Sequence, residues 1–279
     1  MQLSRRAFLG YLLTGGASFL AGHVAGNVYH AEVTRHRLRL ASLTRPLRVA
    51  QLSDLHYGPY LHAGSVRGWV RQAEAEEADL VVLTGDTVDR WFQGSLAPLV
   101  QALAGLSAPL GVWACLGNHD HYRFGAAVTE LEDALAEAGI TLLVNRGTLL
   151  RDDLYLAGVD DYSSGAPNLS AALGGAPGGA ATLLLCHQPD YFPQMTLPAD
   201  LTLAGHTHGG QVRLPFVGTP VTSSSYGERY LQGWAPPPNG RFGRAYVTRG
   251  LGVSFLPVRL NCPPELAVFD LEPGTEPPT

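Results

Sequence analysis

The sequence predicts an α/β protein built on two β-sheets, and two observations carry this prediction. From residue 47 to residue 139, short apolar runs alternate with longer amphipathic segments, as in strands that alternate with helices. From residue 140 to residue 159, three short apolar runs follow one another with no helical segment between them. Because this breaks the alternation, we expect a second sheet to begin after residue 139.

The first half of the chain is expected to hold strands and helices in turn. Strand-like runs lie at 47–52, 79–84 and 112–116, and segments of helical periodicity lie at 65–78, 95–106 and 126–138. The last helix carries Val128, Leu131 and Leu135 on one stripe, and Gly139 is a natural stop. Before these elements, residues 31–45 form a polar, Arg-rich connector with room for an edge strand.

The second half is expected to be richer in strands and loops. Its strand-like runs lie at 140–144, 149–150, 154–159, 181–186, 201–204, 212–214, 245–248 and 266–271, with a short helix at 169–173. A long excursion rich in Ser, Gly and Pro ends near residue 243. We predict a single domain over 46–272 and a disordered tail over 273–279.

Composition limits the classes of partner and chemistry. The chain has 279 residues, of which 46% are hydrophobic, so it is long enough to bury a substantial core. Its net charge is −5 and no Lys/Arg cluster occurs in its body, so we expect no nucleic-acid partner. Three cysteines indicate no disulfide framework, and Cys115 and Cys186 lie inside predicted strands as small buried side chains.

The N-terminus has the pattern of an export signal. Arg5 and Arg6 precede a moderately apolar stretch over residues 8–25, and no acidic residue occurs before Glu32. The paired arginines resemble the twin-arginine signal, which implies the twin-arginine export machinery as a partner and an extracytoplasmic or membrane-anchored location. We assign residues 1–30 to this signal or anchor; cleavage, membrane association and the alternative of an ordinary amphipathic helix stay open.

Polar motifs follow five of the predicted strands. They are Asp54-Leu55-His56, Gly85-Asp86-Thr87-Val88-Asp89-Arg90, Gly117-Asn118-His119-Asp120-His121, His187 and Gly205-His206-Thr207-His208. Six of the ten histidines lie in these loops. Because the loops at the carboxyl ends of strands form the ligand crevice of an open α/β sheet, we expect the motifs to converge on one pocket.

The residue types in these loops indicate a metal centre. Asp, Asn and His without thiolates suit Mn, Fe, Zn or Co rather than Mg or Ca alone. Seven candidate ligands exceed the needs of one ion, but two ions that share a bridging carboxylate would use them. With Asp54 and Asp86 as the carboxylates, two divalent ions keep a formal charge of roughly +2, which favours a phosphate substrate. Taken singly, these aspartates are also turn formers, and His56 or His187 is also a core histidine.

Together the motifs resemble those of calcineurin-like metallophosphoesterases. The pattern D-x-H, G-D-x-x-D-R, G-N-H-D/E, a lone His and G-H-x-H is complete and in order over residues 47–210. The resemblance implies a four-layer α-β-β-α sandwich of two mixed sheets. It also implies one metal held by Asp54, His56 and His208, a second held by Asn118, His187 and His206, and Asp86 as the bridge.

The same resemblance implies the catalytic groups. His119 contacts the phosphate and protonates the leaving oxygen, and Asp120 holds its imidazole in orientation. We expect Asp89 and Arg90 to form a structural pair that supports the loop of Asp86. His121 either lines the mouth of the site or is a solvated loop residue.

Residues downstream of the metal motifs indicate a subgroup of this family and candidate contacts with the substrate. Gly209-Gly210-Gln211, residues 247–252, Pro257-Val258-Arg259 and Pro264-Glu265 resemble an exported or membrane-bound bacterial group that includes phosphodiesterases and UDP-2,3-diacylglucosamine pyrophosphatase-like enzymes. Arg249 and Arg259 either recognise a second phosphate or satisfy loop carbonyls.

The predicted activity is hydrolysis of a phosphodiester or pyrophosphate by a metal-bound hydroxide. The resemblance favours a sugar-nucleotide lipid or another phosphate compound of the cell envelope as the substrate. A phosphomonoesterase that scavenges phosphate, or a non-catalytic binding module on the same fold, are the alternatives.

Overall fold

The computed structural model describes residues 31–236 and 243–275. The predicted signal at residues 1–30 and the last four residues of the predicted tail lie outside them. Within the described ranges, no helix is both long and apolar enough to cross a membrane.

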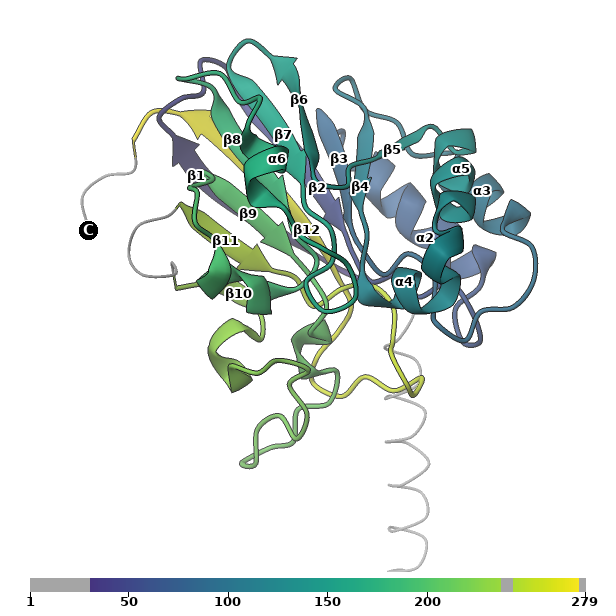
Figure 1. Ribbon diagram of the computed structural model, residues 1–279. Helices are drawn as coiled ribbons and strands as arrows, with labels where there is room; N and C mark the ends of the chain where they lie inside the picture. Colours follow the sequence, from purple (N-terminus) through teal and green to yellow (C-terminus); the bar gives the residue numbers. More distant parts are fainter. Residues whose placement is uncertain (1–30, 237–242, 276–279) are drawn as a thin grey trace, which may run out of the picture.

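Two mixed sheets form the centre of the molecule, as predicted (Figure 1). The first has the strand order β1 (Glu32–Leu40), β12 (Glu265–Pro273), β2 (Leu47–Leu52), β3 (Leu80–Thr84), β4 (Val112–Cys115) and β5 (Ile140–Leu142). The second has the order β10 (Gly233–Ala235), β11 (Arg244–Val247), β9 (Leu201–Ala204), β8 (Ala181–Leu185), β7 (Leu154–Gly158) and β6 (Arg146–Arg151). Antiparallel pairing joins β12 to β2, β10 to β11 and β6 to β7, and the other neighbours are parallel.

Helices cover the outer faces of both sheets. The α-helices are α2 (Ala63–Glu74), α3 (Ala97–Leu103), α4 (Asn118–Phe124), α5 (Thr129–Glu137) and α6 (Leu169–Leu173). The 3-10 turns are η1 (Gly125–Ala127), η2 (Pro189–Gln194), η3 (His208–Gly210) and η4 (Gly227–Tyr230). In Figure 1, α2, α3 and α5 lie beside the first sheet and α6 lies on the second, which gives the predicted α-β-β-α order.

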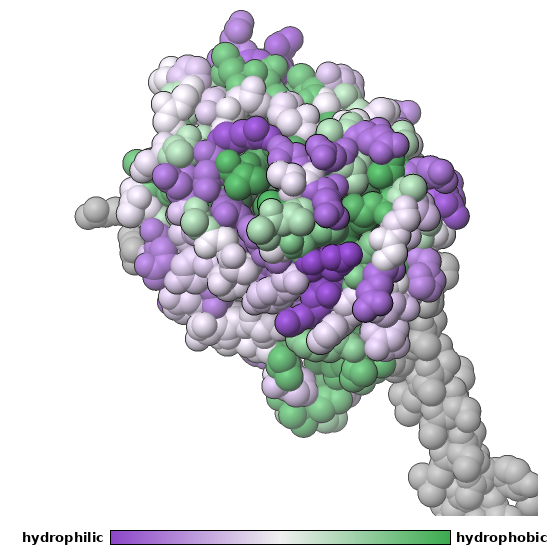
Figure 2. All heavy atoms as spheres, turned by 45° about the vertical axis from the view of Figure 1, so that its right-hand side comes forward, coloured by the Kyte–Doolittle hydropathy of each residue, from purple (hydrophilic) through white to green (hydrophobic). Residues whose placement is uncertain are grey.

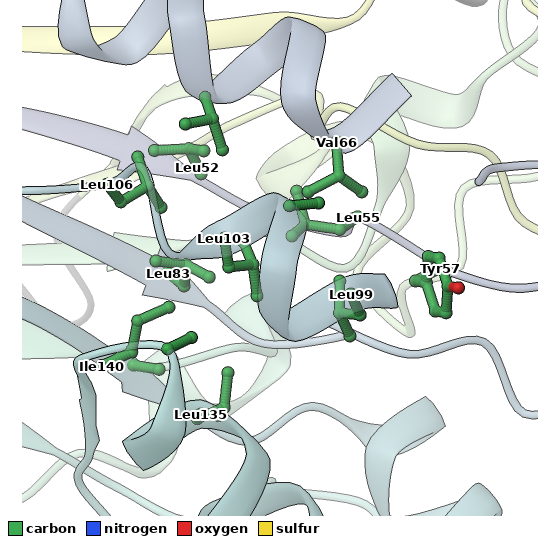
Figure 3. Close-up of a cluster of buried hydrophobic side chains, with 14 of the residues drawn as sticks. Leu52, Leu55, Tyr57, Val66, Leu83, Leu99, Leu103, Leu106, Leu135 and Ile140 are labelled. Carbon is green, nitrogen blue, oxygen red and sulfur yellow. The ribbon is translucent and has the colours of Figure 1, made fainter. Parts of the chain in front are cut away.

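Alternation along the strands divides the core into layers. Side chains such as Val49, Val82, Leu183 and Phe269 fill the space between the sheets. Their neighbours on the same strands, Leu52 and Leu83 among them, face α2, α3 and α5 instead (Figure 3). Successive strand residues point to opposite faces, so β2 and β3 are apolar on both sides because both of their faces are covered.

The topology brings the predicted site loops to one edge. Strands β2, β3 and β4 run parallel in the first sheet, and β8 and β9 run parallel in the second. Their carboxyl ends lie together at the lower end of the molecule in Figure 1. The five polar motifs therefore leave the two sheets at the same end.

Several boundaries differ from the sequence prediction, and three of them affect how the chain is divided. The predicted connector holds the edge strand for which the sequence left room: β1 pairs in parallel with β12 along its whole length, so residues 32–40 belong to the domain. Strand β12 continues to Pro273, so the tail begins later than predicted. Residues 212–214 form only isolated bridges, to Leu260 and Gly218, rather than a strand.

Two short elements were not predicted at all. Helix α4 begins at Asn118, inside a polar motif that lacks apolar periodicity. Strand β10 has three residues and lies inside the excursion that was predicted as loop. Both elements are too short for periodicity to reveal them.

Candidate metal centre

The backbone at the metal motifs is held in a sparsely populated conformation. Five of the seven predicted ligands have positive φ: Asp54, His56, Asp86, His206 and His208. Such left-handed residues are uncommon outside glycine, although Asp and His tolerate them better than most. Strain of this kind clusters at functional sites, where surrounding structure maintains it.

The first group of ligand atoms belongs to Asp54, His56 and His208, all of which are buried. The Nε2 atoms of the two histidines lie 3.0 Å apart, and His208 Nε2 lies 3.5 Å from Asp54 Oδ1. Two imidazole nitrogens, each about 2.1 Å from one ion, are about 3 Å apart when they bind at a right angle. This group therefore has the spacing of a metal site.

The second group belongs to Asp86, His187 and His206, with Asn118 beside it. His187 Nδ1 donates to the carbonyl oxygen of Thr84 at 2.7 Å. In that tautomer Nε2 is an acceptor, and it lies 3.2 Å from both Asp86 Oδ2 and Asn118 Oδ1. Three acceptors that face one another need a cation between them, either a metal ion or a proton on His187 Nε2.

His206 gives independent support for a metal site. Its Nδ1 atom is buried and has no hydrogen-bond partner among the described residues. A buried polar atom without a partner costs free energy unless something binds it, and a metal ion would do so here.

Asp86 lies between the two groups. Its Oδ2 atom is 3.2 Å from His187 Nε2 and 3.5 Å from His56 Nε2. The other oxygen, Oδ1, accepts a hydrogen bond from the backbone amide of His119 at 2.7 Å. All seven predicted ligands are thus gathered in one place, and their donor set fits divalent metal ions.

The pKa shifts of His208 and His187 have opposite directions. Burial lowers the pKa of His208, and nearby His56 and Arg259 lower it further, so the ring is neutral as a ligand must be. Burial alone would lower the pKa of His187 as well, but the carboxylate of Asp86 raises it to about 10. Without metal, a proton on His187 is what neutralises Asp86, and metal ions would compete for that place.

His119 stands at the mouth of the site. It lines a cavity of about 240 Å³ together with Asp86, Asn118, His206 and His208. Its ring lies edge-on to that of His56, with centroids 4.5 Å apart. The position suits the predicted contact with phosphate.

The carboxylate beside His119 is Asp89 rather than Asp120, which corrects the predicted orienting pair. Asp89 Oδ2 lies 3.4 Å from His119 Nδ1 and 3.2 Å from His56 Nδ1. Burial opposes ionisation of Asp89, but hydrogen bonds from the His119 and His56 rings hold its pKa below the usual range. Asp89 therefore orients one predicted ligand and the predicted acid together.

Asp120 has a structural role. Its carboxylate accepts hydrogen bonds from the backbone amides of Val88 and Gly117, at 2.9 and 3.0 Å, and lies 3.4 Å from that of Thr87. These bonds join the loop after β3 to the start of α4. Burial, with the charge of Asp86 nearby, raises the pKa of Asp120 to about 6.

Arg90 does not pair with Asp89 in the described chain, contrary to the prediction. Its guanidinium stacks over the rings of Tyr122 and Trp91, 4.5 and 5.1 Å from their centroids. Arg90 and Tyr122 both line the mouth beside His119. The motif was identified correctly, but the predicted partner of Arg90, Asp89, was wrong.

The three predicted substrate contacts are engaged elsewhere. Arg259 is fully buried and donates to the backbone oxygens of Gly252 and Cys262, which is the structural alternative for this residue, and its Nη2 also lies 3.3 Å from His208 Nδ1. Arg249 donates to Glu32 at 3.0 Å. His121 lies 2.7 Å from Asp160, and that hydrogen bond raises the pKa of its ring.

One supporting residue escaped the sequence analysis. Gln188 donates to Asn118 Oδ1 at 3.3 Å and to Ser163 Oγ at 2.6 Å. It therefore fixes which atom of the Asn118 amide faces the metal site. Its position directly after His187 was the only signal available in the sequence.

The fold and the site together define a metal-dependent phosphoric ester hydrolase. The family model for calcineurin-like phosphoesterases matches residues 47–210, more than half of the chain. The chain belongs to this family.

Several curated bacterial proteins are similar over most of their length. An uncharacterized metallophosphoesterase, YkuE of Bacillus subtilis, is 31% identical, and the match covers 97% of this chain and 98% of that protein. Phosphodiesterase YaeI of Escherichia coli is 32% identical, with 86% and 88% covered. UDP-2,3-diacylglucosamine pyrophosphatase LpxG of Chlamydia muridarum is 26% identical, with 80% and 83% covered.

Proposed function

We propose that this protein hydrolyses a phosphodiester or pyrophosphate bond at a centre of two divalent transition metal ions, Mn, Fe, Zn or Co. The observation that carries the proposal is the pair of ligand groups with Asp86 between them, within 3.5 Å of His56 in one group and 3.2 Å of His187 in the other, and with His119 beside them at the mouth. One ion would be held by Asp54, His56 and His208, the other by Asn118, His187 and His206, and Asp86 would bind both.

The bound ions and the protein side chains then have separate roles in the reaction. When bound, the ions supply positive charge for the phosphoryl oxygens and lower the pKa of a coordinated water. His119 donates a proton to the leaving oxygen from Nε2, because the backbone amide of Arg90 and the carboxylate of Asp89 both lie at Nδ1 of that ring, at 3.3 and 3.4 Å. The cation of Arg90 at the mouth adds attraction for an anionic substrate.

The space beyond the metal site favours a diester over a monoester. A second cavity, of about 350 Å³, adjoins the first, and both are lined by His208, Ser223, Ser254 and Phe255. A phosphate with a second substituent would have room there. The names of YaeI and LpxG agree with such substrates, and we propose a sugar-nucleotide lipid or another phosphate compound of the cell envelope.

The test compares bis-p-nitrophenyl phosphate with p-nitrophenyl phosphate, using Mn-loaded protein and an Asp86→Asn control. Faster cleavage of the diester, lost in the control, is the expected result. Preference for the monoester would point to phosphate scavenging instead. No cleavage of either compound by protein that retains its metal would contradict the proposal.

We further propose export by the twin-arginine machinery. The support is the Arg5-Arg6 pair before the apolar stretch at residues 8–25. Replacing both arginines with lysine should leave the full-length protein in the cytoplasmic fraction, whereas the unchanged chain should reach the membrane or extracytoplasmic fraction. Equal distribution of the two would refute this route.

A further inference from the structure

Two loops at the metal-centre end of the molecule expose large apolar side chains. One contains Phe216 and Val217, and the other contains Phe255 and Leu256; we call residues 214–217 and 255–256 the apolar loops. The side chains of Val217, Phe255 and Leu256 are 73%, 65% and 63% exposed, and Phe216 is fully exposed. Figure 2 shows hydrophobic residues gathered on a protrusion at this lower end of the molecule. Patches of this kind mark sites of interaction.

The two loops are held together as one unit. Gln211 donates to the backbone oxygens of Ser254 and Leu256 and accepts from the amide of Ser254 at 2.8 Å. The backbone of Arg213 and Gln211 also pairs with Leu260 in both directions. These hydrogen bonds therefore hold the two loops in a fixed position relative to each other.

Part of the backbone of the tips is paired from within. The amide of Leu214 donates to Gly218, and the amides of Val217 and Gly218 donate to Leu214. In the other loop, the amide of Leu256 donates to Ser254. Internal pairing reduces the cost of moving a loop out of water, since fewer polar groups lose a partner.

The charge of these segments suits the polar surface of a bilayer. Residues 211–225 and 250–264 contain no acidic residue, although the whole chain has a net charge of −5. Arg213, at the base of the first loop, is the only charged residue of 211–225. Anionic headgroups would therefore meet no carboxylate from either segment.

The chain enters the domain at this same end. Strand β1 is parallel to β12, which is antiparallel to β2, so Glu32 lies at the edge where β2 ends near the metal centre. Glu32 also pairs with Arg249, which follows β11. The thirty residues before the described part include the apolar stretch at 8–25, and they join the domain on the side of the apolar loops.

We propose that the apolar loops dock on a lipid bilayer and face the mouth of the metal site toward it. The cavity of about 350 Å³ is lined by Leu256 of the second loop and by Val212 and Val221, which flank the first loop in the sequence, and it reaches His208. Building on the proposed function, this arrangement selects phosphate esters whose apolar portion lies in the bilayer. The lipid substituent would enter between the loops while the phosphate reaches the metals.

The first test uses environment-sensitive fluorescence in the full-length protein. A nitrobenzoxadiazole label is placed at Phe216→Cys or Phe255→Cys, or at Asp152→Cys in the exposed turn before β7, at the opposite end of the sheet. The three native cysteines are buried, so labelling is selective. On addition of phosphatidylethanolamine–phosphatidylglycerol vesicles, emission from the first two positions should rise and shift to the blue, and emission from position 152 should not.

Other outcomes overturn the proposal. If the protein sediments with vesicles while labels at 216 and 255 stay in water, the chain binds lipid without these loops. If their emission changes with protein concentration and not with vesicles, the loops contact a second copy of the chain. If the protein does not bind vesicles, no docking occurs.

The second test measures selectivity. Phe216→Ser with Val217→Ser removes apolar groups that line neither cavity, and Leu149→Ser on β6 is the matched control, 46% exposed. The double variant should cleave hexadecyl p-nitrophenyl phosphate in vesicles about 10-fold more slowly, with cleavage of soluble bis-p-nitrophenyl phosphate unchanged. Equal rates on the vesicle substrate would refute the inference. If neither substrate is cleaved by any form, the proposed function fails, and the fluorescence result still decides the docking.

Discussion

Asp89 touches two rings of the site, and this position makes it the best target for a single substitution. Its carboxylate contacts Nδ1 of His56, a proposed ligand, and Nδ1 of His119, the proposed acid. Partners of this kind fix the tautomer and orientation of an imidazole. The neighbouring carboxylate, Asp120, binds backbone amides instead.

We predict that Asp89→Asn lowers turnover of the diester by about 10–100-fold and shifts the pH–rate profile, because both rings lose their anionic partner. Steady-state kinetics between pH 5 and 9 provides the measurement. Asp120→Asn should reduce stability more than it alters the profile. The assignment fails if Asp120→Asn shifts the profile and Asp89→Asn does not.

Gly117 permits the close approach of two site loops. A Cβ atom built there would collide with the carboxylate and the backbone amide of Asp86. We predict that Gly117→Ala displaces Asp86 and lowers the metal content of the purified protein, which elemental analysis would measure. Gly178→Ala is the control, since its Cβ would meet no atom within 4 Å. Full metal content in Gly117→Ala would contradict this view of the site.

At the scale of elements, Glu265 joins three strands near the site. At the start of β12, its carboxylate accepts from Thr34 of β1 at 2.6 Å and from Tyr246 of β11 at 2.7 Å. It also accepts from Thr248 and from the amide of Arg249. Burial opposes ionisation of Glu265, but Arg249 and these donors lower its pKa below the usual 4.5.

We predict that Glu265→Gln lowers the free energy of unfolding by about 2 kcal/mol at pH 7, because charged acceptors make the stronger hydrogen bonds. The folded-state pKa is depressed, so this contribution is present above pH 4.5 and is lost as the pH falls through the folded value. Urea unfolding at pH 7 and pH 3.5 should show the difference between the two proteins shrink. Glu272→Gln, at a partly exposed ion pair, should change little. A difference that grows in acid would refute the role of Glu265.

For the whole molecule, the candidate metal centre would link the two sheets. Asp54, Asp86 and Asn118 follow strands of the first sheet, and His187 and His206 follow strands of the second. Bound metal would therefore stabilise the packing of the two sheets against each other, because only the folded chain gathers these ligands.

We predict that chelation lowers the melting temperature by about 10–20 °C. Each ion at a hundred times its Kd contributes about 2.7 kcal/mol, so two ions contribute about 5 kcal/mol, and each kcal/mol is worth about 2–4 °C for a chain of this size. Circular dichroism melts with and without EDTA provide the measurement, and Asp86→Asn should respond less. Identical melts of the metal-loaded and chelated proteins would show that the ions do not tie the sheets together.

The sequence by itself determined the two-sheet α/β class, most of the strands and the set of residues that meet at the metal centre. The physical reason is that strands can be recognised from local apolar runs in the sequence. Parallel strands then place their carboxyl ends at the same edge of the sheet. Strand β2 at Leu47–Leu52 and β9 at Leu201–Ala204 were predicted to the residue. Asp54 and His206 then follow from their places after those strands.

Only the tertiary structure decided the contacts between distant segments. Asp120 is next to His119 in sequence, yet Asp89, thirty residues earlier, is next to it in space. The sequence left open a contact between Arg259 and phosphate. In the structure the side chain is buried and donates its hydrogen bonds to nearby carbonyl oxygens. Strand β1 reads as a polar connector because its partner β12 lies more than 200 residues away. Short stretches of sequence predict the residue types of a motif, whereas these pairings depend on how the whole chain packs.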